Sequence, residues 1–340
     1  MTDYHDQPIT FTLAGKLQRD TILPLSGVPA IDIPSGNLVY AAAGMHLWGE
    51  QAGLLARVSP DFPLDWLERF EALGFDLQGI KVATEPIDMR RFAAYSDPQT
   101  AHYENPLTYF AERGLSFPSN LLAYEGNPSR LCSKNQYEAQ SIHVNDMPEA
   151  YKEARAAHIC PIDFMSHKIL PSILRAGNVQ TVTMSATPGY MDPIFWEEIP
   201  TLISDLTAFM AGEDEVRKLF QGRSVDLWDI ARQLASFGPE YVLIRLRDGG
   251  QYLYDGVSRK RWVVPAYPVQ VDDPTGAPDA FAGAFLAIYR QTYDSLQATL
   301  CGNIAASFVV EGCGPYFALD AMQGLKEARL EALKDMVSEI

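Results

Sequence analysis

Short apolar runs alternate with stretches of helical periodicity along most of this chain of 340 residues, and that alternation restricts its fold more than any other feature. Such runs are typical of strands buried in a sheet, and the stretches between them are typical of crossover helices. The candidate strands are residues 9–15, 52–59, 156–161, 179–184 and 240–246. A helix that is apolar on most sides is expected at 37–49. This order of elements predicts the α/β class with a largely parallel sheet.

Two stretches interrupt the alternation, residues 16–34 and residues 85–130. The second contains "MRRFAAYSDPQTAHYENPLTYF", which mixes alternating apolar residues with polar turns and shows no clean helix. These stretches either pair as the strands of a small lid or run as long surface loops, and loop-length statistics favour the lid. The sequence has no internal repeat and no low-complexity linker. We therefore expect one domain over residues 1–340 with a small β lid.

Charge, cysteines and hydropathy argue against several classes of protein. The formal net charge is −16, and Lys and Arg are not clustered, which argues against a nucleic-acid surface. The four cysteines form no CxxC pair, so neither a disulfide framework nor a zinc site is suggested. No signal-peptide pattern and no apolar run near the roughly 20 residues of a membrane helix is present. A cytoplasmic protein without a membrane partner is expected, and a nucleotide ligand stays open because Mg²⁺ can carry its charge.

The stretch "DPTGAPDAFAGAFLAIYR", residues 273–290, predicts a turn that runs into a helix. Its apolar positions Phe281, Phe285 and Ile288 follow helical spacing. Free backbone N–H groups and the positive end of the helix dipole gather at such a helix start, which makes it an anion site. Asp279 lies in the first turn, where an acid either stabilises the helix end or takes part in catalysis. The residues alone leave both roles open.

The segment "DDPTGAPDAF" resembles the signature of the ribokinase/PfkB family of sugar and nucleoside kinases, usually D-x-T-G-A-G-D-x-F. Other parts of the chain resemble further family segments: "GKLQRD" the first-strand motif, "PSGNLVYAAAGMHLWG" the N-terminal glycine pair with its helix, "LIRLRDGGQYLY" the strand-turn-strand near the nucleotide, and "GNIAASFVVEGCG" the helix beside the purine. The resemblance implies a ribokinase-like three-layer fold with a mostly parallel central sheet and a small β lid. It also implies phosphoryl transfer from ATP to a hydroxyl of a small sugar or nucleoside-like molecule.

The resemblance further implies a role for each matching residue. Asp279 is the general base, and the N–H groups around Gly276 and Ala277 stabilise charge on the transferring phosphoryl group. Such transfer depends mostly on positioning and electrostatics, so few residues are needed. The remaining assignments are Asp20, Gly36 and Tyr40 for the acceptor, Thr275, Arg247, Gly250 and Asn303 for the nucleotide, and Glu215 for Mg²⁺. ATP and Mg²⁺ are the implied cofactors, and a monovalent cation is left open.

Without the resemblance, simpler interpretations hold for several of these residues. Asp20 is then a solvated turn acid, Glu215 a charge on a helix surface, and Arg247 an exposed turn arginine. Tyr40, His46 and the aromatic stretch "HYENPLTYF" are compatible with a nucleoside acceptor, but a structural aromatic cluster explains them equally well.

Departures from the family pattern lie at positions that the resemblance associates with catalysis and ligand binding. Pro278 stands where the second glycine is usual, which removes one N–H from the presumed anion hole and fixes φ at about −65°. The other departures are Ser35 for the first glycine of the N-terminal pair, Tyr40 for a sugar-binding asparagine, Gly212 for the asparagine of an N-x-x-E motif, Arg247 for a glycine and Ser185 for an acid. Losing one such donor costs ~2.7–4 kcal/mol, or a hundredfold to a thousandfold in rate. Proline is tolerated at a helix start, so Pro278 is expected to impair the chemistry and not the fold, and Arg247 is a candidate compensating cation.

Two functions therefore remain open. The first is an active small-molecule kinase that Pro278 slows. The second is a pseudokinase that binds nucleotide or a small polyol as a regulatory or partner subunit. A dinucleotide-dependent dehydrogenase is disfavoured, because no G-x-G-x-x-G lies between a first strand and a helix. A homodimer through the lid is a further expectation, since paired strands with an open face invite association.

Overall fold

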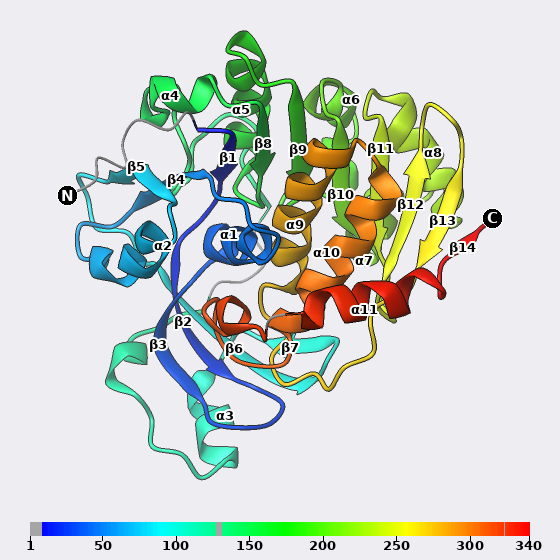
Figure 1. Cartoon of the computed structure of the whole chain (residues 1–340). Coiled ribbons are helices and arrows are strands. Elements are labelled where there is room, and N and C mark those ends of the chain that lie inside the picture. Colours follow the sequence, from blue (N-terminus) through cyan, green and yellow to red (C-terminus); the bar gives the residue numbers. More distant parts are fainter. Residues whose placement is uncertain (1–8, 127–130, 323) are drawn as a thin grey trace.

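The computed structural model describes residues 9–126, 131–322 and 324–340, and within these ranges the strands form a ten-stranded sheet and a four-stranded sheet (Figure 1). The order of the large sheet is β14-β13-β12-β11-β10-β9-β8-β1-β4-β5. Its strands are β1 (Phe11–Ala14), β4 (Gly53–Val58), β5 (Asp76–Val82), β8 (Ala156–Ile159), β9 (Thr181–Ser185), β10 (Ala208–Gly212), β11 (Tyr241–Arg245), β12 (Gln251–Asp255), β13 (Arg261–Val264) and β14 (Ser338–Glu339). The strands from β5 to β11 in this order run parallel, while β12, β13 and β14 pair antiparallel at one edge.

Helices cover both faces of the large sheet and complete three layers (Figure 1). One face carries α4 (Glu149–Lys152), α5 (Phe164–Ala176), α6 (Ile199–Ile203), α7 (Glu213–Leu219) and α8 (Leu227–Ser236). The other carries α1 (Asn37–Leu47), α2 (Glu68–Ala72), α9 (Ala277–Thr292), α10 (Ser295–Val309) and α11 (Leu325–Lys334). Alternate residues of each strand serve the two layers: on β11, Val242 and Ile244 pack towards the first group and Leu243 towards the second.

Each strand and helix expected from periodicity is present, with bounds that differ by one to a few residues. The five predicted strands are β1, β4, β8, β9 and β11, and the helix expected at 37–49 is α1. Side-chain caps fix several helix starts, as when the Asp294 carboxylate accepts a hydrogen bond from the Gln297 N–H at the start of α10. The prediction of an α/β fold with a mostly parallel central sheet is confirmed. None of the helices in the described ranges is both long and apolar enough to span a bilayer.

The small sheet has the order β3-β2-β6-β7 and lies beside one end of the large sheet (Figure 1). Its strands are β2 (Gln18–Leu23), β3 (Ala30–Ser35), β6 (Arg90–Asp97) and β7 (Thr100–His102). The two stretches that interrupt the sequence alternation thus contribute strands, and residues 113–126 of the second form turns and a short 3-10 helix (Ser119–Leu121). Parallel pairing of β2 with β6 places Asp20 beside Arg91. This pairing positions the ion pair between Asp20 and Arg91 that is described below.

The expectation of no clean helix in residues 85–130 was wrong, because α3 (Pro106–Glu112) lies there. This helix is too short to impose a visible period, and packing of Phe110 against Phe92 and Leu23 holds it on the outer face of the small sheet. A homodimer through this sheet stays a prediction. Residues 127–130 of the same stretch lie outside the described residues.

Candidate active site

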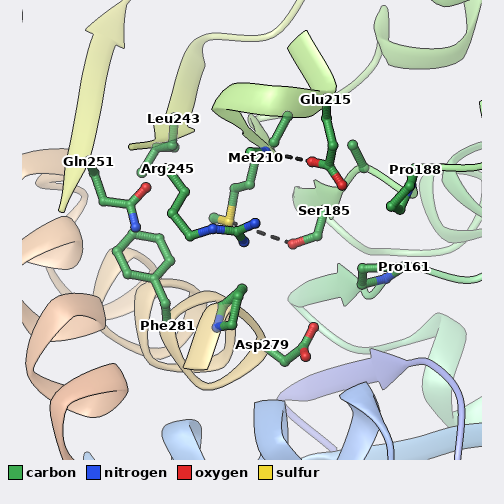
Figure 2. A pocket seen from close by; sticks show the side chains of 14 residues that line it. Pro161, Ser185, Pro188, Met210, Glu215, Leu243, Arg245, Gln251, Asp279 and Phe281 are labelled. Atoms are coloured by element: carbon green, nitrogen blue, oxygen red, sulfur yellow. Dashed lines mark hydrogen bonds between the residues drawn. The ribbon is translucent and has the colours of Figure 1, made fainter. Parts of the chain in front are cut away.

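A cavity of about 150 Å³ lies at the carboxyl ends of the parallel strands, opposite the start of α9 (Figure 2). Its lining includes Pro161 after β8, Ser185 of β9, Gly212 of β10, Arg245 of β11, and Glu215, Pro278 and Asp279 from the helix starts. Parallel strands bring their carboxyl ends to one edge, and ligands of open α/β sheets bind there. At roughly 30 Å³ per water molecule, the cavity has room on the scale of a phosphoryl group with some of its hydration.

The start of α9 depends on a glycine. Gly276 caps the helix with φ +77°, and a Cβ there would fall 2.1 Å from the nearest ring atom of Tyr40. The Ala277 N–H makes a long turn bond to the Pro274 carbonyl at 3.3 Å, and the Asp279 N–H bonds to the Gly276 carbonyl at 3.1 Å. Pro278 is the second residue of the helix and has no N–H. The donors left for an anion are therefore the N–H groups of Gly276 and Ala277.

Asp279 lines the cavity from the first turn of α9. Protein surrounds its carboxyl on most sides, and this burial raises its pKa to about 7, although Arg245 and Arg91 lower the pKa in part. Within the described ranges the carboxyl forms no side-chain hydrogen bond or ion pair. An unpaired acid whose pKa lies near neutral pH has the protonation properties that a general base needs.

Glu215 and Arg245 face each other across the end of β10. The Glu215 Oε2 atom accepts a hydrogen bond of 2.5 Å from the Gly212 N–H, burial raises the pKa of the Glu215 carboxyl, and Arg245 lowers it. A Cβ on Gly212 would fall 2.8 Å from the Arg245 Nη2 atom. The guanidinium group of Arg245 therefore occupies the space beside Gly212 that a larger side chain would fill.

Arg247, which the sequence suggested for the nucleotide phosphates, does not line this cavity. Its exposed guanidinium forms an ion pair with Asp214, with 2.5 Å between Nε and Oδ1, and its backbone N–H bonds to Glu213. The structure therefore brings Arg245, two residues earlier, to the site.

Asp20 does not line this cavity, and it is fully buried and already paired. Its Oδ2 atom accepts hydrogen bonds from the Arg91 Nη2 at 2.6 Å, the Arg91 Nε at 3.0 Å and the Ser35 hydroxyl at 2.6 Å. The Oδ1 atom is buried and has no partner among the described residues. Asp20 is thus no solvated turn acid. Ser35, a departure from the family pattern, is one of its donors.

Two more buried polar atoms near Asp20, the Tyr40 hydroxyl and the Asp273 Oδ2 atom, form no hydrogen bond of standard geometry among the described residues, although Ser35 lies close to Tyr40 and lowers its pKa in part. Burial raises the pKa of Tyr40, and the nearby carboxylates of Asp273 and Asp20 raise it further. Buried polar groups in proteins are usually hydrogen-bonded, so three such atoms together require an explanation. Water or a hydroxylated ligand would satisfy them.

Gly36 and Thr275 hold the connections around this cluster. Gly36 starts α1 with φ +107°, and a Cβ there would fall 2.3 Å from the Lys16 carbonyl oxygen. The Thr275 hydroxyl lies 2.8 Å from the Tyr95 hydroxyl, which links the loop before α9 to the small sheet. Neither residue lines the cavity.

Gly250 and Asn303, suggested for the nucleotide, both contact the segment after β13. A Cβ on Gly250 would fall 2.4 Å from the Val264 carbonyl oxygen, and the Asn303 Nδ2 donates to the Pro265 carbonyl at 2.9 Å. In this structure both residues support that segment, and they do not line the cavity.

The Glu215 carboxylate on the cavity fits a hydrated Mg²⁺ ion. Mg²⁺ usually keeps several waters and takes one or two carboxylates together with substrate phosphates. Glu215 retains one oxygen, Oε1, with no hydrogen bond among the described residues. In the described part of the chain no group of three or more His, Cys, Asp or Glu residues forms a closed metal site. An ion here would therefore rely on phosphate and water for most of its ligands.

Comparison with known proteins identifies the family of this chain. The model of a family described as "pfkB family carbohydrate kinase" matches residues 134–322, more than half of the chain. The chain belongs to the pfkB family. A cytidine kinase of Thermococcus kodakarensis is 25% identical to this pfkB protein over 285 residues, which cover 83% of the chain and 89% of the relative.

Two solved structures show the fold that this pfkB protein shares. An E. coli protein assigned as a ribokinase II, in complex with ATP and Mg²⁺, superposes with a TM-score of 0.69 at 18% identity over 95% of this chain and 99% of its own. A fructokinase double mutant of Vibrio cholerae with fructose, ADP and potassium ion superposes with a TM-score of 0.69 at 15% identity over 96% of this chain and 100% of its own. The ribokinase-like fold predicted from the sequence motifs is therefore confirmed.

The sequence interpretation missed two arginines of the site. Arg245 ends the apolar run "YVLIR", and a charged residue at the carboxyl end of a parallel strand is a signal for a ligand site that could have identified it. Arg91 carries no such signal, because its contact with Asp20 depends on the pairing of β2 with β6, far apart in the sequence.

Proposed function

We propose that this pfkB protein transfers the γ-phosphoryl group of ATP to a hydroxyl of a small sugar or nucleoside-like molecule, with Asp279 as the general base. The observation that carries the proposal is the unpaired Asp279 carboxyl, which lies on the cavity at the start of α9 and has its pKa raised by burial to about 7. The family membership supports the same chemistry.

The reaction needs few groups. The Asp279 carboxylate accepts the proton of the acceptor hydroxyl while that oxygen bonds to the γ-phosphorus and the bond from phosphorus to the leaving oxygen of ADP breaks. The N–H groups of Gly276 and Ala277 stabilise the charge on the phosphoryl oxygens. Glu215 would hold Mg²⁺, and the ion would supply charge neutralisation at the phosphates.

The buried cluster around Asp20 is the proposed acceptor site. Its three unpartnered oxygens, on Asp20, Tyr40 and Asp273, can bond with the hydroxyls of a polyol ring. Gly36 shapes the backbone beside Tyr40, while Thr275, Gly250 and Asn303 order the segments next to the proposed nucleotide site. Cytidine and fructose, named for two similar proteins, represent the two acceptor classes. The potassium ion named for the fructokinase makes a monovalent cation worth testing here.

A second candidate function is a pseudokinase that binds nucleotide or a polyol without turnover. Two observations favour it. Pro278 removes an N–H from the helix start, and side chains of the protein already fill the acceptor region, since Arg91 pairs with Asp20 and the Tyr40 ring packs on Gly276.

A screen followed by a turnover assay separates the two functions. Thermal shift is measured with Mg-ATP against a panel of sugars and nucleosides, because a ligand that binds the folded state raises Tm by mass action. Phosphoryl transfer to the hits is then measured. Transfer that Asp279→Asn removes supports the kinase, whereas nucleotide binding with no transfer across the panel supports the pseudokinase. Absence of any stabilisation at millimolar Mg-ATP with candidate acceptors present contradicts both.

A further inference from the structure

Arg245 is the cationic side chain on the lining of the cavity, and Figure 2 shows its guanidinium group extending into the space between Glu215 and Asp279. The two carboxylates flank it, yet no ion pair or side-chain hydrogen bond of Arg245 is found within the described residues. Arg247, in contrast, is paired with Asp214 outside the cavity. An arginine that lies on a cavity without a partner has its donors available for a ligand.

The ligand that fits these donors is a phosphoryl group. A guanidinium presents its N–H groups as a planar fork that matches two phosphate oxygens at once. Pro278 contributes to the same cavity and lacks the N–H that the family pattern supplies. Pro278 of α9 therefore leaves one N–H donor missing from the cavity. Arg245, at the end of β11, extends into the same cavity.

Gly212 leaves the space that the Arg245 guanidinium occupies. A Cβ at residue 212 would fall 2.8 Å from the Arg245 Nη2 atom and 3.3 Å from the Glu215 Oε2 atom. Any larger residue would push the guanidinium out of its position, and an asparagine, the residue usual in the family, is larger still. The loss of that asparagine and the presence of Arg245 are thus sterically linked.

We propose that Arg245, in the space left by Gly212, binds the transferring phosphoryl group and replaces the donor lost at Pro278. The phosphoryl group is the one of the proposed kinase reaction, so the inference rests on that function for its catalytic part. Its binding part stands apart from turnover, because an unpaired arginine on the cavity also binds a polyphosphate anion that is not transferred.

The experiment compares Arg245→Gln and Arg245→Lys with Arg232→Gln as the matched control. Arg232 is an exposed arginine of α8 paired with Asp229, so its variant removes the same charge away from the cavity. Affinity for ATP with and without Mg²⁺, and for inorganic tripolyphosphate, is measured by calorimetry. We expect Arg245→Gln to weaken tripolyphosphate and ATP binding at least tenfold, Arg245→Lys to recover part of the loss, and Arg232→Gln to match the wild type within twofold. Circular dichroism and Tm verify that each variant is folded.

Gly212→Asn tests the steric link without removing the arginine. It should reproduce the loss seen in Arg245→Gln, and the double variant should lose no more than either single variant, because both changes act on one contact. A loss in Gly212→Asn that adds fully to that of Arg245→Gln contradicts the link.

Catalysis gives a further readout. Where the wild type turns over, Arg245→Gln should reduce kcat/KM by tenfold to a hundredfold and move the acid limb of the pH profile to higher pH, because Arg245 lowers the pKa of Asp279. A merely structural role for Arg245 would not move that limb.

Each outcome decides between the proposals. Tripolyphosphate affinity that is equal in the wild type and Arg245→Gln, or not measurable in the wild type, overturns the inference about Arg245 whatever the turnover. Loss of tripolyphosphate binding in Arg245→Gln in a protein with no turnover supports the inference and leaves the pseudokinase as the function.

Discussion

The proposed phosphate side of this pfkB protein, with Asp279 and Arg245, and its proposed acceptor side, with Asp20 and Arg91, place their charges in opposite ways. On the phosphate side, Asp279 and Arg245 line a cavity and form no ion pair within the described residues. On the acceptor side, the fully buried Asp20 forms a short ion pair with the partly buried Arg91, and Ser35 supports it. The first arrangement keeps its charges available for a ligand that brings its own charge. The second satisfies its charges internally and leaves only single polar atoms for a neutral ligand.

The physical cost differs as well. The exposed guanidinium of Arg245 on the cavity stays hydrated, so its loss should affect function more than stability. The buried Asp20 carboxylate has given up its hydration, and removal of Arg91 leaves its charge uncompensated. The two sides should therefore respond differently to matched substitutions, in activity on one side and in folding on the other.

Asp279→Asn should have the largest effect on activity. A positioned general base contributes roughly 10²–10⁴-fold, so turnover should fall by that factor while Mg-ATP binding is kept. In the wild type, kcat/KM should rise as pH increases towards about 7 and level off above it, because the base must be deprotonated and burial raises its pKa to about 7. Initial rates across pH test both points, and equal activity in wild type and variant means that the base is misassigned.

Asp279→Asn should also change the pH dependence of stability. In the wild type, stability should fall as pH rises, whereas kcat/KM should rise. The folded pKa of Asp279 is raised above its ordinary value of 3.8, so the folded state holds the proton more tightly and stability falls as pH rises from about 4 to about 7. The asparagine side chain of the variant cannot ionise. The variant should therefore unfold at a higher Tm than the wild type above pH 7 and at a similar Tm near pH 4.

Arg91→Gln should have the largest effect on stability. It leaves the Asp20 carboxylate buried without its cation, and breaking a buried pair in this way costs about 3–5 kcal/mol. Denaturant unfolding of Arg91→Gln, Asp20→Asn and the double variant measures the coupling. Asp20→Asn in the Arg91→Gln background should recover part of the loss, and Arg245→Gln should cost less than about 1 kcal/mol. Equal destabilisation by Arg91→Gln and Arg245→Gln would remove the contrast between the two sides.

Whether a feature could be predicted from the sequence depends on how far apart in the chain its interacting residues lie. The sheet, α1 and α9 were predictable because apolar periodicity is local, and the turn before α9 carries its own sequence signature. Arg91 was not predictable because its partner is set by the pairing of β2 with β6. The position of the Tyr40 ring on Gly276 and the raised pKa of Asp279 depend on packing between segments far apart in the chain. The helix α3 was missed because seven residues are too few to reveal a period.

Pro278→Gly should increase turnover on the phosphate side, by up to about a hundredfold if one preorganised donor is restored. Arg245 limits that gain if it already replaces the donor, so the increase should be larger in the Arg245→Gln background than in the wild type. Glycine also adds unfolded-state entropy and should lower stability by roughly 1 kcal/mol. Initial phosphoryl-transfer rates for the four proteins, at saturating Mg-ATP, provide the test. Equal gains in both backgrounds would mean that Arg245 and residue 278 act independently.

Tyr40→Phe should produce the smallest effect and tests the acceptor side at a single atom. The Tyr40 hydroxyl is buried without a partner among the described residues, and an unsatisfied buried donor costs roughly 1–3 kcal/mol. Removal of the hydroxyl keeps the ring that packs on Gly276, so the variant should be as stable as the wild type or more stable by about 1 kcal/mol. If an acceptor hydroxyl bonds to Tyr40, the KM for that acceptor should rise severalfold while the KM for ATP stays unchanged. Chemical denaturation with and without the acceptor, together with both KM values, measures these effects. A clear loss of stability in the free variant would show that the hydroxyl is already hydrogen-bonded, for example to a buried water. The polar atoms of the acceptor side would then be satisfied in the free protein, as its charges are.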